Sequence, residues 1–439
     1  MYDVRTYASH RPLALLRTFM RDIMQGVADL DAVGGDLVVA GPSWTPQVMF
    51  VRHPDLLREV LVDRNADLVK ARGLRLARRI LGDGLLTSEL PVHTRQRKLV
   101  LPAFHHRRLA VYGRAFVDLA SEETETWTPG QPFDVAASMN RLALRIAGRT
   151  LFGADVLSDA GRVSDAVHEA MVAFDGAQFP LADKLTWLPT RANRQSGRAR
   201  TTLDDVVYGL IHERRQSPGG DDLLQMLLDA RDADTGEAMT DEEVRDEAMT
   251  LLLAGHETTA VALAWTWALL ANYPDAEADL WAEVDGLGAD PTFEDLRQLA
   301  VTRQTFAEVM RLRPPAWAVG REAARDTELG GHPVRRGTTI LFAPYHVHRD
   351  PRFWDDPETF RPDRHQRGAD RHKFAYLPFS AGRRGCIGEQ FAWAEGTLVL
   401  ATLARRWRLR PAGPVPAEHG SVTLRPAGPM CMTPEPRRS

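Results

Sequence analysis

The stretch FSAGRRGCIGEQFAWAEGTLVLATLARR, residues 379–406, decides the fold of this chain. It places Cys386 among glycines, directly before apolar residues at helical spacing, and predicts a helix from about Cys386 to Arg406. The start of a helix offers unpaired N–H groups and a positive dipole end, which favour a thiolate. Glycines let the backbone approach a flat partner closely. The stretch therefore predicts a ligating cysteine, and the alternative is a buried structural one.

Five positions of this stretch match a known pattern, F-x-x-G-x-R-x-C-x-G: Phe379, Gly382, Arg384, Cys386 and Gly388. The stretch thus resembles the cysteine loop of the cytochrome P450 family. The resemblance implies that Cys386 is the axial thiolate ligand of haem b (heme, iron protoporphyrin IX) and that the other four residues contact the cofactor. A thiolate ligand pushes electron density onto iron and favours cleavage of an O–O bond. Cys431, in PMCMTP, has no such surroundings and is expected to be structural.

A long apolar segment, residues 248–273, carries polar residues at its centre. Its length would suit a membrane span, but an ionisable pair there is expensive in lipid, so we expect a helix through the middle of the protein. Its AGHETT, residues 254–259, resembles the family's oxygen-binding element. By that resemblance Gly255 makes room for O2 at the iron, Thr258 hydrogen-bonds the oxygen or a water, and Glu257 relays protons. The alternative is a Thr258 hydroxyl bonded to the preceding helical turn and a Glu257 carboxylate paired elsewhere.

Two sets of charged residues match further family patterns. Glu308 and Arg311 lie three apart on one helix face and fit E-x-x-R, and Arg364 in FRPDR fits the arginine that completes this structural triad. The resemblance implies that the triad fastens the surroundings of the cysteine loop. It also nominates His93, Arg97, Arg321 and Arg384 as ligands of the two haem propionates, which require cations. For any single arginine, the alternative is a solvated surface position.

Composition excludes several classes of protein. The net charge of −4 gives no indication of a nucleic-acid partner, and two cysteines are too few for a disulfide scaffold. The first thirty residues hold no apolar run long enough for a signal peptide. We expect a soluble, cytoplasmic bacterial protein with no transmembrane segment.

Helical periodicity dominates the chain, with short β-like runs at residues 36–40, 47–51, 316–342 and 422–424. The length of 439 residues alone favours two or three domains. The resemblance instead implies one mainly α haem domain over residues 1–439: a triangular α-rich body, a small β-rich lobe and a long central helix over the haem. We expect a monomer with no fused reductase, so that electrons from NAD(P)H arrive through a ferredoxin and a ferredoxin reductase.

The implied reaction is RH + O2 + two electrons + two protons giving ROH and water. An apolar substrate is expected, a terpenoid or carotenoid before a fatty acid, in a pocket lined by Leu81, Leu86, Leu253 and Ala254. The alternatives are a peroxide-driven peroxygenase of the same fold and a non-catalytic haem-thiolate sensor or carrier. Glu257 and Thr258 count against the peroxygenase, because such enzymes tend to lack an acid–alcohol pair.

Overall fold

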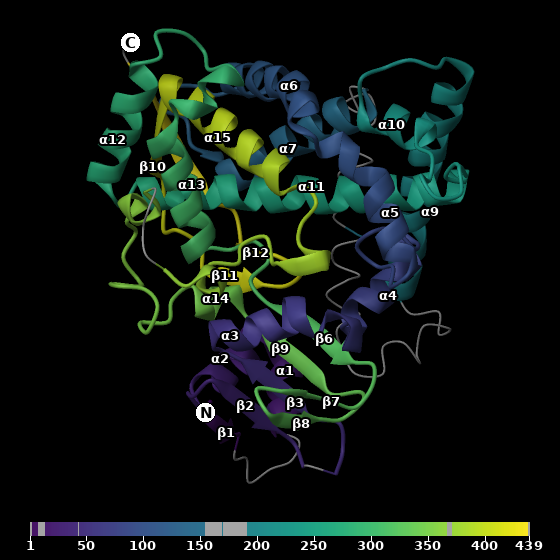
Figure 1. Ribbon diagram of the computed structural model, residues 1–439. Coiled ribbons are helices and arrows are strands. Elements are labelled where there is room, and N and C mark those ends of the chain that lie inside the picture. The colour runs from purple at the N-terminus through teal and green to yellow at the C-terminus, as the bar shows by residue number, and fades with distance from the viewer. Residues whose placement is uncertain are drawn as a thin grey trace.

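The computed structural model of the protein describes residues 2–7, 14–42, 44–153, 169, 191–366 and 371–437. Helices form the broad end of a roughly triangular molecule, and a β-rich lobe near the N-terminus forms the narrow end (Figure 1). The predicted mainly α fold with a smaller β-rich lobe is confirmed.

The helices are α1 (Ala14–Arg21), α2 (Ile23–Asp31), α3 (Pro54–Arg58), α4 (Arg72–Leu81), α5 (Val92–Val100), α6 (His106–Glu125), α7 (Val135–Phe152), α9 (Arg191–Gln216), α10 (Leu223–Asp229), α11 (Asp241–Leu270), α12 (Pro274–Asp285), α13 (Ala300–Leu312), α14 (Pro344–Val347) and α15 (Glu389–Arg406). The strands are β1 (Val4–Thr6), β2 (Leu37–Ala40), β3 (Val48–Val51), β4 (Leu68–Lys70), β5 (Phe133–Asp134), β6 (Val319–Ala323), β7 (Thr327–Leu329), β8 (His332–Val334), β9 (Thr339–Phe342), β10 (Trp407–Pro411), β11 (Glu418–Gly420), β12 (Leu424–Pro426) and β13 (Cys431–Pro436).

Helix α11 runs through the centre of the molecule (Figure 1). A capping box starts it: the Glu243 amide donates to the Thr240 hydroxyl, and the Thr240 amide donates to the Glu243 carboxylate. The predicted helix at 248–273 is thus confirmed, and this cap together with acidic residues in the first turn extends it towards the N-terminus. None of the described helices is long and apolar enough to cross a membrane.

The main sheet of the β-rich lobe joins strands that lie far apart in sequence. Its order is β1-β2-β3-β9-β6-β4, so that β4 forms one edge. Because β4 and β6 pair antiparallel, Lys70 lies opposite Arg321. The sheet thereby brings two basic residues from distant segments together.

One predicted boundary moves in the structure, and two further segments take a defined form. The helix predicted from about Cys386 begins at Glu389, because the glycine-rich residues before it form a turn. The segment 293–312 forms a short 3₁₀ turn at Glu294–Arg297 and then α13. The segment 316–342 holds four strands, and Gly330 and Gly331, both with positive φ, connect β7 to β8.

Candidate functional site

The cysteine loop is a tight turn that only glycine permits at its centre. Gly382 has φ +72°, and a Cβ there would lie 2.1 Å from the Leu61 carbonyl oxygen. The Cys386 amide donates to the Phe379 carbonyl at 2.9 Å, which closes the turn. The Phe379 ring lies edge-on to Trp393 on α15, with centroids 5.5 Å apart. The loop is therefore fastened on both sides, and its cysteine side chain remains exposed.

The Cys386 residue keeps exposed surface, but the protein packed around its thiol keeps water away from the sulfur. This desolvation raises the pKa of the thiol to about 11. The Gly388 amide hydrogen-bonds the sulfur and acts in the opposite direction, but its effect is smaller. The thiolate predicted from the helix start concerns sulfur bound to iron; without a bound metal, desolvation of the thiol outweighs the hydrogen bond from one amide. A bound metal cation would drive release of the proton. Among the described residues, no three His, Cys, Asp or Glu side chains form a cluster that could hold a metal ion.

One face of α11 stays partly accessible in the middle of an otherwise buried helix. Ala254, Gly255 and Thr258 keep exposed surface, whereas their neighbours His256 and Glu257 are buried. A Cβ placed on Gly255 would meet no heavy atom within 4 Å. The predicted oxygen-binding element therefore presents a glycine and a hydroxyl to open space.

Both polar groups of the predicted acid–alcohol pair are hydrogen-bonded within the protein. The Thr258 hydroxyl donates to the Ala254 carbonyl at 2.8 Å, the arrangement given above as the alternative. The buried Glu257 carboxylate accepts a hydrogen bond of 2.8 Å from the Thr423 hydroxyl. Burial lowers the pKa of His256 to about 4, so the imidazole is neutral. Thr423 was missed from the sequence, because no motif marks it and it lies 166 residues from Glu257.

All four predicted propionate ligands belong to one cluster of basic groups. Lys70, Arg97, Arg321 and Arg384 all repel the charged form of His93, and together with burial they lower its pKa to about 3. Burial and the arginines also lower the pKa of Lys70 to about 7 and that of Arg321 to about 10.

Individual contacts tie this cluster to the cysteine loop. Arg97 donates to the Gly385 carbonyl at 2.7 Å, and Arg384 lies 2.6 Å from the Glu89 carboxylate. Lys70 donates to two backbone carbonyls, at 2.9 and 2.6 Å. The buried Nε atoms of Arg321 and Arg384 have no hydrogen-bond partner among the described residues. This concentration of buried cations fits a cofactor with two carboxylates. Lys70 was missed, since only the β4–β6 register places it there.

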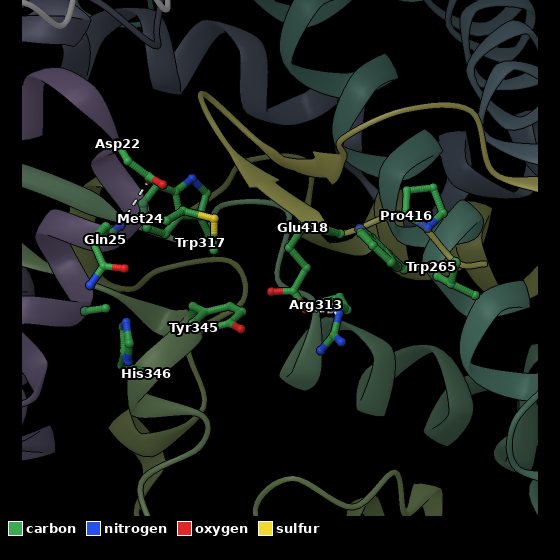
Figure 2. Close-up of a pocket in the computed structure, with 13 residues that line it drawn as sticks. Asp22, Met24, Gln25, Trp265, Arg313, Trp317, Tyr345, His346, Pro416 and Glu418 are labelled. Carbon is green, nitrogen blue, oxygen red and sulfur yellow. Dashed lines mark hydrogen bonds and ion pairs between the residues drawn. The ribbon is translucent and has the colours of Figure 1, made fainter.

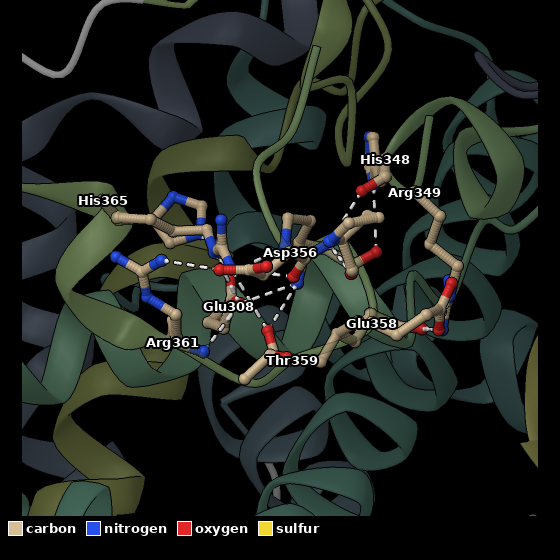
Figure 3. Close-up of polar contacts among 12 residues, drawn as sticks. Glu308, His348, Arg349, Asp356, Glu358, Thr359, Arg361 and His365 are labelled. Atoms are coloured by element: carbon tan, nitrogen blue, oxygen red, sulfur yellow. Dashed lines mark hydrogen bonds and ion pairs between the residues drawn. The ribbon is translucent and has the colours of Figure 1, made fainter. Parts of the chain in front are cut away.

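Glu308 is the centre of a buried ion network, shown in Figure 3. Its carboxylate accepts from Arg311 at 2.8 Å and from Arg364 at 2.9 Å, so the structure brings the predicted triad together. His365 also contacts it, at 2.8 Å, and was not predicted. Hydrogen bonds from Arg311 and His365 outweigh burial and lower the pKa of Glu308 to about 2. Arg311 further donates to carbonyls of His348, Pro357 and Thr359, which binds α13 to the long loop before the cysteine.

The residues predicted to line a substrate pocket divide into two pairs. Leu81 and Leu253 are packed into the core, whereas Leu86 and Ala254 are partly exposed. Figure 2 shows a different pocket of about 670 Å³, between α2, α14 and the segment before β11, with Trp265 and Trp317 in its wall. None of the four residues lines this pocket.

Comparisons with known proteins agree on the family. The family model Cytochrome P450 matches residues 18–432. Cyclooctatin synthase of Streptomyces melanosporofaciens is 40% identical, over 95% of this chain and 92% of that protein. Cyclooctat-9-en-7-ol 5-monooxygenase of the same organism is 39% identical, over 94% and 91%. Pentalenene oxygenase of Streptomyces avermitilis is 37% identical, over 81% and 80%. The solved haem domain of cytochrome P450DA is similar with a TM-score of 0.82 at 28% identity, over 98% of this chain and 94% of that one.

Proposed function

Since the chain belongs to the cytochrome P450 family and is a monooxygenase of that family, we propose that it hydroxylates a terpenoid, with Cys386 as the axial ligand of haem b. The observation that carries this proposal is the exposed Cys386 thiol in its fastened glycine loop, beside a cluster of buried cations. The bound haem supplies the activation of O2 and its reduction by two electrons.

Residues of this chain bind the haem propionates, shape the cysteine loop and fasten the segment before it. His93, Arg97, Arg321 and Arg384, joined by Lys70, hold the propionates, because five basic groups lie around one buried position. Phe379, Gly382 and Gly388 shape the loop that presents the sulfur. Glu308, Arg311 and Arg364 fasten the segment that precedes this loop and do not touch the reacting atoms.

Glu257 and Thr258 have the catalytic roles in proton delivery. The open space at Gly255 and the partial exposure of Thr258 support these roles, because O2 needs room beside the hydroxyl that would donate to it. The Thr258 hydroxyl now bonds to Ala254 and can turn away from that carbonyl to donate to a ligand. The reaction consumes two protons per substrate, so a carboxyl beside a hydroxyl has a defined task.

The names of the relatives favour a terpenoid over a fatty acid. Two of them carry cyclooctatin-type names and one a pentalenene name, and all three cover most of this chain. Of the four residues predicted to line the pocket, Leu86 and Ala254 keep accessible apolar surface that such a substrate could contact. A carotenoid remains the second substrate class to test.

Electrons come from separate proteins in this proposal, a ferredoxin and an NAD(P)H-dependent reductase. Four basic residues of one segment, Arg95, Lys98, Arg107 and Arg108, are candidates for a docking face. Three of them are already paired: Arg95 with Glu243, Lys98 with Asp234 and Arg108 with Asp221. Arg107 and Arg383 remain exposed, the latter within the cysteine loop. A ferredoxin surface that matches these two arginines is therefore the better docking hypothesis.

One experiment tests the proposal against its rivals. The haem-loaded protein is incubated with cyclic terpene alcohols, a carotene and a fatty acid, either with a surrogate ferredoxin, its reductase and NAD(P)H or with hydrogen peroxide alone. Hydroxylated terpenoid only with the redox proteins is the expected result. Product with peroxide alone would favour the peroxygenase, and no product under either supply would favour the sensor. Cys386→His should abolish the thiolate-type absorption spectrum of the reduced carbon monoxide complex, whereas the control Cys431→Ser should retain it.

A further inference from the structure

The β11–β12 hairpin is held rigidly against two other parts of the protein. The Trp265 indole of α11 donates to the Leu424 carbonyl at 2.8 Å, and the Trp317 indole donates to the Ser421 carbonyl at 2.9 Å. The Leu424 amide donates to the Pro315 carbonyl at 3.0 Å. Figure 2 shows Trp265 beside Pro416, in the segment that leads into the hairpin, and Trp317 beside Met24 of α2. These three hydrogen bonds, together called the clamp, fix the turn of the hairpin in place.

Thr423 lies in this turn, between the carbonyls that the two indoles bind. It is buried, and its own carbonyl accepts from the Ser421 amide at 3.0 Å. Its hydroxyl donates to Glu257 Oε1 at 2.8 Å. Glu257 and Trp265 are eight residues apart on α11, so they share the helix face that the hairpin covers. The clamp on Leu424 therefore also sets the position of the hydroxyl that reaches the acid.

We infer that Thr423 is the positioning residue for Glu257: the clamped hairpin presents a hydroxyl that orients this carboxyl for proton delivery. A buried carboxyl has two or three rotatable bonds and a choice of rotamers, and one short hydrogen bond from a rigid donor selects among them. Misplacement of a catalytic group by about 1 Å is enough to slow a reaction strongly. The inference deepens the proposed function, because Glu257 has a proton-delivery role only in a monooxygenase.

The chain offers a matched control. Thr266 lies on α11, is fully buried, and its hydroxyl donates only to the Ala262 carbonyl of its own helix, at 2.8 Å. Thr266→Val removes the same group as Thr423→Val from a comparable environment, without touching Glu257. Thr423→Ser keeps the hydroxyl and removes a methyl group.

The first measurement does not depend on turnover. The infrared band of the Glu257 carboxyl in the haem-loaded resting protein is assigned by difference from Glu257→Gln. Thr423→Val should shift this band, Thr423→Ser should restore it, and Thr266→Val should leave it in place. An unshifted band in folded Thr423→Val would overturn the inference.

The second measurement is the fraction of NAD(P)H electrons recovered in hydroxylated product, with its solvent deuterium isotope effect. Thr423→Val should lower this fraction about tenfold and enlarge the isotope effect, because proton transfer becomes limiting. Thr423→Ser should recover most of the loss. Equal losses in the valine and serine variants would indicate a packing role and sink the proposal.

If Thr423→Val fails to fold, Trp317→Phe gives the same test, since it removes one hydrogen bond from the clamp and keeps an aromatic ring. It should shift the infrared band in the same direction and lower the product fraction to a smaller degree. If no variant, nor the parent protein, makes product while the infrared shift is present, the proposed function has failed and the positioning contact stands.

Discussion

At the scale of single residues, some buried charged groups are neutralised by groups of opposite charge, whereas others are disfavoured by burial and by like charges nearby. Glu308 is entirely buried, and two arginines and a histidine surround its carboxylate. Lys70 and Arg321 are also buried, and desolvation together with repulsion by Arg384 lowers the pKa of both although Glu89 attracts them. The first arrangement stabilises the protein alone, whereas the second suits an anionic ligand.

Glu308→Ala should therefore be severely destabilising. It leaves Arg311 buried without its carboxylate, a change that costs about 3–5 kcal/mol of unfolding free energy. The comparison is Glu358→Ala, which removes the exposed partner of Arg349 and should cost less than about 1 kcal/mol. Urea unfolding measures both, and equal losses would contradict the central role of Glu308.

The lowered pKa of Glu308 also predicts a pH dependence. A carboxyl with a folded pKa of about 2 stabilises the folded state above its unfolded pKa, which is about 4.3. This contribution should be lost as the pH falls from there through about 2. The unfolding free energy of the parent protein should thus fall more steeply over this window than that of Glu308→Gln.

Lys70→Met should act in opposite directions on the two forms of the protein. In the haem-free protein it removes an ammonium group that burial disfavours and that Arg384 and Arg321 repel, and these effects together outweigh its attraction to Glu89 and Glu247, so urea unfolding should require more denaturant. In the haem-loaded protein it removes a propionate ligand, so haem transfer to apomyoglobin should be roughly tenfold faster, the value of one charged hydrogen bond. Lys98→Met, at an exposed position, should change neither quantity. A loss of stability in both forms would contradict this role for Lys70.

At the scale of secondary-structure elements, α11 combines a structural and a functional requirement. Most of its length is buried, chiefly against α7 and also against α9, α13 and α15, which requires regular helix and apolar side chains. Residue 255 of this helix is a glycine, although a Cβ at this position would meet no heavy atom within 4 Å. Packing against the described residues therefore does not explain this glycine, and we propose that access to a ligand does.

Gly255→Ala should consequently stabilise the protein while impairing turnover. Alanine in a helix interior is favoured over glycine by about 0.5–1 kcal/mol. The added methyl group occupies space where O2 would bind, so less of the NAD(P)H consumed should appear as product. Gly209→Ala, on an exposed part of α9 with equally open surroundings, should give the stability gain alone. Undiminished product formation in Gly255→Ala would contradict the assignment of this face.

At the scale of the whole molecule, the basic cluster joins the β-rich lobe to the helical body. Lys70 and Arg321 come from the lobe, His93 and Arg97 from α5, and Arg384 from the cysteine loop. Removal of haem should therefore destabilise the junction between the β-rich lobe and the helical body before it destabilises the hydrophobic core. Hydrogen exchange of the haem-free protein should rise first in β4, β6 and the cysteine loop, while α7 and the buried part of α11 stay protected. Uniform loss of protection would argue against a junction held by the cofactor.

Local patterns were enough to predict the fold class, the central helix and Cys386 as the candidate ligand. These patterns are glycines at set distances from Cys386 and apolar periodicity over residues 248–273. The start of α15 was predicted three residues too early, because it depends on how the turn before it is packed.

Which distant residues meet depends on the folded arrangement of the chain. Lys70 reaches the cluster through the β4–β6 register, His365 reaches Glu308 across a long loop, and Thr423 reaches Glu257 through the clamped hairpin. No local pattern marks these residues, since a single lysine, histidine or threonine is ordinary anywhere on a surface. Their importance arises from burial beside a charge, which is a property of the folded chain.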